Sequence, residues 1–334
     1  MRPQVVLLFN EPVNTEEPSE VGVIGEAEDI VSALESKGHA VESRPVSRQT
    51  LLPTLSELED RRESVVVFNL CEGLNGHSHH EPLLAGLLEL HRLRFTGSPS
   101  STLSWALDKR VAKAILGFAG VRTPGAQAFC TAGSMDEIKE FALPAIVKPV
   151  REDGSLGITA DSVVHTADEL HARIRWVLET YRQPALVEGY LTGREFNMSI
   201  LGEGDDARLL PVEEILFEGY SPGEPRLLSY DAKWRVGSHD DVRTIPKCPA
   251  AVDGNLRDAM ESLALTTYQA FGCRDYARID IRLDGGGTPH VLDVNPNPDI
   301  SRVAGMALAV TQSGMSYEEF VDSVVEAAWN RTPY

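Results

Sequence analysis

Cysteine is scarce in this sequence, and no two cysteines form a CxxC pair. The four cysteines lie far apart along the chain, which argues against a zinc ribbon and against a disulfide scaffold: Cys71, Cys130, Cys248 and Cys273. No apolar run approaches the ~18 residues of a membrane span. The short apolar run near the N-terminus meets Asn10 and Glu11 at once, and no small-residue cleavage site follows it. We therefore expect a first β-strand there and not a signal peptide.

Positive charge is also in short supply. The chain has 31 lysine and arginine residues against 50 aspartate and glutamate residues, which gives a formal net charge of −19. Nucleic acids and anionic membranes would be repelled over most of such a surface, so neither is expected as a partner. The composition is otherwise globular, and 334 residues correspond to two or three domains at ~150 residues each. We expect a soluble, cytoplasmic protein.

The first hundred residues alternate strands and helices and predict a small open α/β domain, residues 1–100. Val5–Phe9 and Val65–Leu70 are continuous apolar runs, as in strands buried on both faces of a parallel sheet, and Arg94–Thr96 is a shorter candidate strand. Such sheets bind ligands at the carboxyl ends of their strands. Here those ends carry Asn10–Glu11 and Cys71–Gly73.

The rest of the chain predicts two α+β units, residues 101–187 and 188–334. In the first unit we expect a helix from about Ser104 to Phe118, a helix from the capping box at Thr166 to about Thr180, and strands at Ala145–Lys148, Ile158–Val164 and Ala185–Glu188. In the second we expect strands at Arg194–Leu201 and Arg208–Val212, a mobile loop at Glu218–Arg226, a helix at Asn255–Phe271, a hairpin of Tyr276–Leu283 with His290–Val294, and a last helix from the capping box at Ser316.

The predicted hairpin carries the most informative group of polar residues. Alternation places Arg278 and Asp280 on one face of its first strand, and Asp293 and Asn295 together on its second. Antiparallel pairing can bring Asp280, Asp293 and Asn295 to one point. Two carboxylates and an amide oxygen suit Mg²⁺, which completes its coordination with phosphates and water. The alternative is an exposed face with alternating charges.

Three further segments allow a functional and a simpler interpretation. Lys148 precedes a glycine-bearing turn that contains Ser155, and such a turn either cradles phosphates or only joins two strands. Glu188 and Glu195 bracket a short segment, and one of them could accept ribose hydroxyls, or both could be solvated. The loop with His77, His79 and His80 could hold a transition metal, although close histidines on a polar loop are more often solvated.

These segments occur in one order along the chain, together with several others: Asp108-Lys109, Val147-Lys-Pro149, Val187–Glu195, Tyr230-Asp-Ala-Lys-Trp234, Ala277-Arg-Ile-Asp280 and Leu292–Pro298. The series resembles the ATP-grasp superfamily and, within it, the D-alanine–D-alanine ligases and their relatives. The resemblance covers essentially the whole chain. It implies an ATP-grasp fold behind an N-terminal open α/β (pre-ATP-grasp) domain, and an ATP-dependent carboxylate–amine ligase that works through an acylphosphate.

The resemblance also implies roles for individual residues on the ATP side. Lys109 and Lys148 would grip the nucleotide phosphates, with Ser155 in the loop that covers them. Glu188, Tyr190 and Leu191 would lie at the adenine, and Glu195 at the ribose. Asp280, Asp293 and Asn295 match the magnesium ligands of the family, and Mn²⁺ could bind there in place of Mg²⁺. Lys233 would approach the γ-phosphate from the flexible loop, and Arg278 would stabilise the tetrahedral intermediate.

The substrate side departs from the family pattern. No residue of Asn14–Val21 aligns with the family's glutamate-serine motif, and Glu72 stands in the segment that replaces its His-Gly. Pro-Gly becomes Pro298-Asp299, and the serine expected to bind a substrate carboxylate becomes Ala304. The candidate substrate contacts are Glu72, Asp299, Ser301 and Arg302, of which Asp299 could bind an ammonium group and Arg302 a carboxylate. We therefore expect small amino-acid or peptide-like substrates and predict that D-alanyl-D-alanine is not the best product. The alternative is that nearby groups such as Ser301 or Glu20 replace the lost contacts, so that D-alanine still fits.

Two other function classes are weighed against a ligase. A kinase on the same scaffold would not need the oxyanion-stabilising Arg278. A dehydrogenase would need a GxGxxG after the first strand, where the chain has Phe9-Asn-Glu-Pro12. The family resemblance also implies a homodimer.

Overall fold

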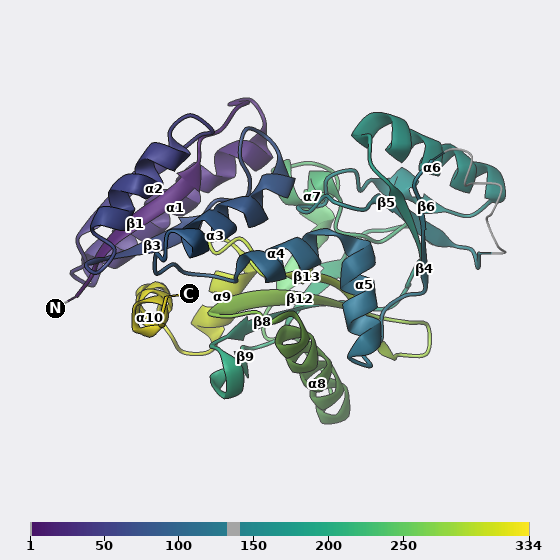
Figure 1. Ribbon diagram of the computed structural model, residues 1–334. Helices are drawn as coiled ribbons and strands as arrows, with labels where there is room; N and C mark the ends of the chain where they lie inside the picture. Colours follow the sequence, from purple (N-terminus) through teal and green to yellow (C-terminus); the bar gives the residue numbers. More distant parts are fainter. Residues whose placement is uncertain (1, 132–140, 334) are drawn as a thin grey trace.

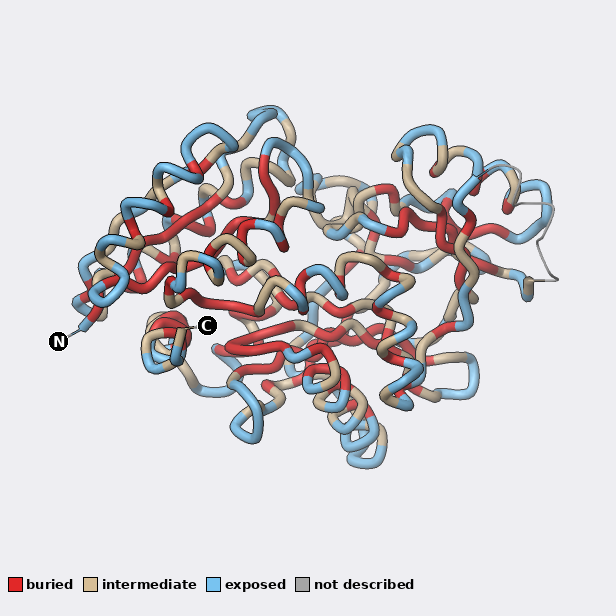
Figure 2. The backbone as a smooth tube through the Cα atoms, viewed as in Figure 1, coloured by how far each residue is buried: buried red, intermediate tan, exposed pale blue. Residues whose placement is uncertain are grey.

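The computed structural model describes residues 2–131 and 141–333 and contains three β-sheets with helices packed on them (Figure 1). Buried residues are concentrated in the strands, as Figure 2 shows. None of the helices in the described ranges combines the length and the apolar character that crossing a membrane requires.

The first sheet is parallel, with strand order β2-β1-β3. It contains β1 (Gln4–Asn10), β2 (Val41–Val46) and β3 (Val65–Leu70), and its helices are α1 (Pro18–Ser36), α2 (Leu51–Asp60) and α3 (Glu81–Leu90). Because strand side chains alternate, Val5 and Leu7 pack with α1, whereas Val6 and Leu8 pack with α2 and α3. The C-terminal helix α10 (Tyr317–Asn330) returns to this unit and packs against α1 (Figure 1).

The second sheet is antiparallel, with strand order β4-β7-β5-β6. It contains β4 (Ala126–Phe129), β5 (Ala145–Pro149), β6 (Val163–Val164) and β7 (Ala185–Gly189) and is covered by α6 (Ala167–Tyr181). The capping box at Thr166 is confirmed, because its hydroxyl accepts from Glu169 N and the Glu169 carboxylate accepts from Thr166 N.

The third sheet holds the predicted hairpin in the order β11-β10-β8-β12-β13, with β9 paired to β8. Its strands are β8 (Glu195–Leu201), β9 (Arg208–Leu209), β10 (Glu213–Phe217), β11 (Thr244–Lys247), β12 (Tyr276–Leu283) and β13 (Pro289–Asn295). Ala277, Ile279 and Ile281 pack on α8 (Gly254–Phe271). The opposite face of β12 therefore carries Arg278, Asp280 and Arg282.

The remaining helices are α4 (Ser100–Leu107), α5 (Lys109–Phe118), α7 (Tyr230–Trp234) and α9 (Gly305–Gln312), with short 3-10 turns at Ser78–His80, Ala160–Ser162, Gly204–Asp206 and Asp241–Arg243. The capping box at Ser316 begins α10 as predicted. Division of the chain into units at residues 100 and 187 stays a prediction.

Several predicted elements differ from the structure. The helix expected over 104–118 is two helices, because Asp108 has an extended backbone and its carboxylate accepts from Arg110 N to begin α5. The strand expected over 158–164 is a 3-10 turn followed by the two-residue β6, and the one expected over 208–212 is the two-residue β9. At 94–96 the structure has a single bridge between Phe95 and Val67.

Candidate active site

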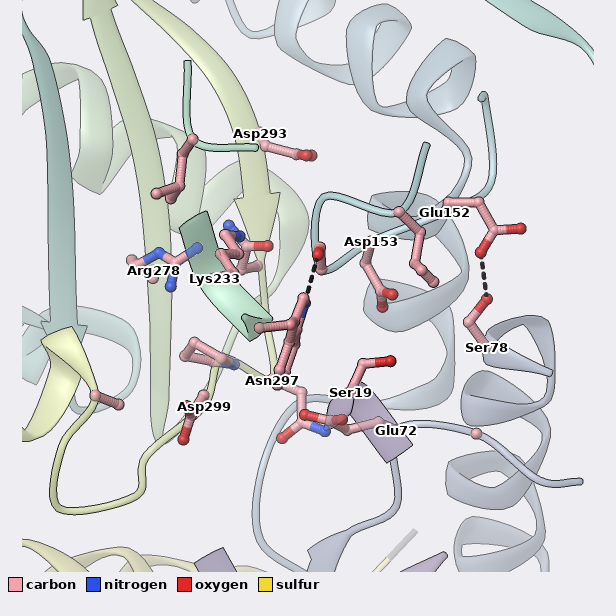
Figure 3. Close-up of a pocket in the computed structure, with 18 of the residues that line it drawn as sticks. Ser19, Glu72, Ser78, Glu152, Asp153, Lys233, Arg278, Asp293, Asn297 and Asp299 are labelled. Carbon is pink, nitrogen blue, oxygen red and sulfur yellow. Dashed lines mark hydrogen bonds between the residues drawn. The ribbon is translucent and has the colours of Figure 1, made fainter. Parts of the chain in front are cut away.

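A cavity of about 740 Å³ is lined by segments from all three sheets. The loop after β3, the start of α5, the turn after β5, helix α7 and the β12–β13 hairpin all contribute to its wall. A smaller cavity of about 120 Å³ adjoins it and shares Lys109, Asp153 and Lys233 with it. Figure 3 shows side chains from these segments around the larger space. A site of this kind can hold two ligands in contact.

The hairpin brings the predicted metal-binding residues together. Asp280 lies opposite Asp293 in the β12–β13 register, and Arg278 lies opposite Asn295. Arg278 donates to both oxygens of Asp280 over 2.7 and 3.0 Å, and Asn295 Nδ2 donates to Asp280 Oδ2 over 3.0 Å. Burial works to lower the pKa of Arg278, but Asp280 outweighs it and raises that pKa, so the guanidinium stays charged.

Asp293 faces the lysines of the site. Lys109 Nζ lies 3.9 Å from Asp293 Oδ2. Burial works to raise the pKa of Asp293, but the charges of Lys109 and Lys148 outweigh it and lower that pKa. Asp293 is therefore an ionised oxygen donor within reach of two cations.

Glu188 is held by two lysines. Lys148 Nζ and Lys113 Nζ each lie 2.5 Å from one of its carboxylate oxygens, and its side chain is 2% exposed. Burial works to raise the pKa of Glu188, yet Lys148 and Lys113 outweigh it and lower that pKa. Sequence reasoning missed Lys113; its spacing of four residues from Lys109 on α5 was the available signal.

Glu195 has a buried partner of its own. Arg282 Nη1 lies 3.0 Å from Glu195 Oε2, and the two residues face each other across β8 and β12. Burial raises the pKa of Glu195 despite Arg282. Arg282 also donates to the carbonyls of Gly193 and Arg226. The predicted alternation put Arg282 on this face, but no role was assigned to it.

The glycine-bearing turn after β5 is closed by helix α7. Gly154, Ser155 and Gly157 all have positive φ. Ser155 Oγ donates to Leu228 O over 2.8 Å, and Trp234 Nε1 donates to Gly154 O over 2.8 Å. These contacts place the segment after the predicted mobile loop directly over the turn.

Lys233 of α7 lies on the wall of both cavities. Burial lowers the pKa of Lys233, and the positive charge of Arg278 lowers it further. Tyr230, on the same helix, donates to Glu17 and to Ser19 of the N-terminal unit. Helix α7 therefore joins the turn, the hairpin and the N-terminal unit.

All three residues predicted at the adenine, Glu188, Tyr190 and Leu191, lie outside the lining of both cavities. Tyr190 Oη donates to Arg226 O over 2.8 Å, and its ring lies under the guanidinium of Arg282. Leu191 is partly buried in the segment between β7 and β8.

The predicted substrate contacts separate into two groups. Glu72 and Asp299 line the larger cavity. Ser301 and Arg302 do not. Arg302 is at the surface, where it pairs with Glu318 over 2.7 Å and with Asp29 over 3.6 Å, because the loop after β13 turns away towards α1 and α10. Ser301 donates its backbone N–H to Asp299 Oδ1.

The three histidines form a cluster beside the cavity. Their ring centroids lie 4.3–5.3 Å apart, for His77, His79 and His80. Nowhere in the described ranges do three or more histidine, cysteine or acidic side chains converge as a metal-binding group. The transition-metal interpretation of this loop is therefore not supported.

Most of the chain matches a known family. Residues 111–326 match the family model described as D-ala D-ala ligase C-terminus. The chain is 29% identical over 321 residues to a D-alanine–D-alanine ligase of Cupriavidus necator, and this alignment covers 93% of each protein. It is 31% identical over 309 residues to the uncharacterized protein y4sG of Sinorhizobium fredii, covering 91% of this chain and 88% of that protein.

Solved structures share the fold. A D-alanine–D-alanine ligase from Bacillus anthracis, solved in complex with ATP, superposes with a TM-score of 0.77 at 20% identity and covers 98% of this chain and 97% of that one. The VanG D-Ala:D-Ser ligase from Enterococcus faecalis gives a TM-score of 0.76 at 20% identity, covering 98% and 100%. The predicted ATP-grasp fold is confirmed.

Proposed function

The chain belongs to the D-alanine–D-alanine ligase family, and from this premise we propose how its site uses ATP and which ligands it takes. It is an ATP-dependent ligase of that kind. In the proposed reaction a substrate carboxylate oxygen attacks the γ-phosphorus of ATP, and ADP leaves with the electron pair of the broken P–O bond. The amine of a second substrate then attacks the acyl carbon, loses a proton and expels phosphate, which leaves an amide.

The nucleotide would lie along the smaller cavity and extend into the larger one. Lys109 and Lys148 supply positive charge for its phosphates, and the positive-φ turn around Ser155 supplies backbone N–H groups. Glu195 can accept the ribose hydroxyls while Arg282 keeps its position. Glu188, Tyr190 and Leu191 would lie towards the adenine.

Asp280, Asp293 and Asn295 would hold Mg²⁺ or Mn²⁺. The donor set fits a hard cation, since Asp280 and Asp293 lie opposite each other in the hairpin and the side-chain amide of Asn295 contacts Asp280. A bound Mg²⁺ would neutralise charge on the ATP phosphates. The Asp280 carboxylate already accepts hydrogen bonds from Arg278 and from Asn295 Nδ2. A metal ion would therefore need a lone pair of this carboxylate that these two donors leave free.

Arg278 and Lys233 are the proposed catalytic residues. Arg278 stays charged and can stabilise the oxyanion that forms when the amine adds to the acyl carbon. Lys233 stands on α7 above the glycine-bearing turn, where it can reach the transferred phosphate. With α7 held over the turn by Trp234, water would be excluded from the phosphates, which would protect an acylphosphate from hydrolysis.

The substrates are proposed to be small amino-acid or peptide-like molecules other than D-alanine. Asp299 on the cavity wall and Ala304 at the start of α9 support this, because neither offers a substrate carboxylate a positive charge or a side-chain donor. We further propose a homodimer, and a cytoplasmic location because that compartment supplies ATP. Light scattering on the purified protein would test the dimer.

The observation that carries the proposal is the arrangement of Asp280, Asp293, Arg278 and the site lysines around the two adjoining cavities. The test is release of ADP and phosphate with MgATP and a panel of amino acids and dipeptides, with mass spectrometry of the products. A product lighter by one water than its two substrates is expected. A stable phosphorylated product would instead show a kinase.

A further inference from the structure

A row of polar side chains crosses the third sheet and lines the two cavities. Asp293 lies opposite Asp280, and Asp280 lies opposite Asn197. Asn197 in turn lies opposite Glu213, and its Nδ2 donates to Glu213 Oε2 over 3.2 Å, so these side chains share a face. Neighbouring strands lie about 4.8 Å apart, which puts Glu213 about 10 Å from Asp280 along the row. The row therefore runs from the proposed metal site to Glu213.

Glu213 lies against the first turn of helix α9. It is 2% exposed and lines the larger cavity together with Ala304 and Gly305. A Cβ on Gly305 would lie 2.9 Å from Glu213 Cδ and would collide with Oε2, so the carboxylate fills the space beside this glycine. Ala304 gives the helix N-terminus no side-chain cap. The protein's own Glu213 therefore supplies the anion that a helix N-terminus favours.

The bases of the cavity wall are engaged elsewhere. In the described structure they are Lys109, Lys233 and Arg278. Lys109 lies at the other end of the row, 3.9 Å from Asp293 Oδ2. Arg278 makes two hydrogen bonds within the proposed metal site, and Lys233 is placed for the transferred phosphate. A substrate carboxylate beside Glu213 would therefore find no base free to pair with it.

The charge of Glu213 acts in the same direction as its position. Burial raises the pKa of Glu213, which the hydrogen bond from Asn197 and the charge of Arg278 oppose. A substrate carboxylate beside it would raise that pKa further, so the two groups could coexist only after one of them had taken up a proton. A neutral carboxamide adds no charge, and its N–H group can donate to the Glu213 carboxylate.

The position of Glu213 in the row indicates which substrate it faces. The acyl donor must reach the γ-phosphate, which the proposed metal site and Lys109 would hold at the Asp293 end. The amine has no need to touch that phosphate, because it attacks the acyl carbon. Glu213, two strands away from Asp280, therefore faces the amine.

We propose that Glu213 selects the amine substrate by excluding amines that carry a carboxylate next to the reacting nitrogen. The amine is therefore one without an adjacent carboxylate, such as an amino-acid amide, and not a free amino acid. This inference rests on the proposed ligase function, because it assigns one substrate of that reaction.

The test compares alaninamide with alanine as the amine, in both enantiomers, with MgATP and a panel of amino acids as acyl donors. Mass spectrometry distinguishes the two products, and kcat/KM is measured for each amine. Because a like charge ~5 Å away at an effective dielectric constant of ~20 weakens binding by more than a factor of ten, we expect the wild type to favour the amide at least tenfold.

Substitution of Glu213 isolates its contribution. An amino-acid amide has more free amine at neutral pH than the acid, and this chemical difference cancels when the amide-to-acid ratio of kcat/KM is compared between proteins. Glu213→Gln, which removes the charge and keeps the shape, should lower the ratio at least tenfold. Glu213→Ala, which opens the space beside Gly305, should lower it as well. An unchanged ratio in a folded Glu213→Gln protein would overturn the inference, and so would a wild type that uses alanine as well as alaninamide.

Glu214→Gln is the matched control. Glu214 is the next residue on β10, and its carboxylate accepts two hydrogen bonds from Arg194, which like Glu214 does not line either cavity. The ratio should stay within twofold of wild type in this variant. A fall as large as that in Glu213→Gln would refute Glu213 as the origin of the selection.

Binding separates this inference from the ligase function. Calorimetric titration of the full chain with alaninamide and with alanine, after loading with magnesium and a non-hydrolysable ATP analogue, should show the same shift in relative affinity in Glu213→Gln. If the shift is seen but no amide product forms with any pair, the ligase function is wrong and the selection by Glu213 stands. If products form and the ratio does not respond to Glu213→Gln, the ligase function stands and this inference is wrong.

Discussion

The Lys113–Glu188–Lys148 group provides a quantitative test of the nucleotide site. Two ammonium groups flank one buried carboxylate, each at 2.5 Å, so the group carries a net charge of +1. The substitution Lys113→Met removes one positive charge and leaves Glu188 to Lys148 alone. Lys148 is then neutralised by Glu188, and the positive potential that attracts the phosphates falls.

The size of the effect follows from the geometry. A phosphate bound at Lys148 would lie on the order of 10 Å from Lys113 Nζ, and at an effective dielectric constant of ~20 one unit charge contributes ~1.7 kcal/mol at that distance. Since ~1.4 kcal/mol corresponds to a factor of ten, we expect binding of a magnesium ATP analogue to weaken about tenfold or more.

Calorimetric titration with that analogue is the measurement. Lys113→Arg should restore most of the affinity, and Lys247→Met, which removes an exposed lysine on β11, should change it by less than twofold. Unchanged affinity in a folded Lys113→Met protein would refute the reasoning that Lys113 sets the charge of this group.

Three further predictions concern the metal site, the turn and acid stability. Asp280→Ala or Asp293→Ala should lower Mg²⁺-dependent turnover by at least about 100-fold with an unchanged circular dichroism spectrum, and near wild-type turnover would exclude that residue as a ligand. Gly157→Ala should lower the free energy of unfolding in urea by about 1–3 kcal/mol, because φ is +78° and a Cβ there would lie 2.8 Å from a proline ring carbon. In contrast, Gly117→Ala, with open space on helix α5, should raise the free energy of unfolding by about 0.5–1 kcal/mol. Burial opposes ionisation of Asp108, but neighbouring arginines lower its pKa to about 2, so its stabilising contribution is present above about pH 4 and is lost as pH falls through 2. The difference in unfolding free energy between wild type and Asp108→Asn should therefore shrink over that range. A constant difference would contradict this prediction.

The hairpin could be predicted from the sequence because its physics is local. Alternation with a period of two fixes which side chains share a face, and a short turn fixes the register. The structure accordingly places Asp280 opposite Asp293 and Arg278 opposite Asn295. The capping boxes at Thr166 and Ser316 were predictable for the same reason, since each depends on four consecutive residues.

Elements and contacts that depend on distant segments were missed. Strand β2 lies at the edge of its sheet and buries only Val46 fully, so it has no continuous apolar run to reveal it. The helical spacing over 104–118 hid the break at Asp108. The Lys113–Glu188 and Arg282–Glu195 pairs join residues 75 and 87 positions apart, and no local pattern predicts such partners. Arg302 was expected at the substrate, but its loop carries it to Asp29 and Glu318 at the surface.

The central claim is that a substrate carboxylate is activated by phosphoryl transfer before the amide forms. The direct measurement uses a substrate whose carboxylate carries ¹⁸O at both oxygens, together with MgATP and an amine, and follows the label by mass spectrometry. Because the carboxylate oxygen that attacks the γ-phosphorus leaves with phosphate, the account predicts one ¹⁸O atom in each phosphate released. Unlabelled phosphate, with the displaced ¹⁸O released into water instead, would contradict it.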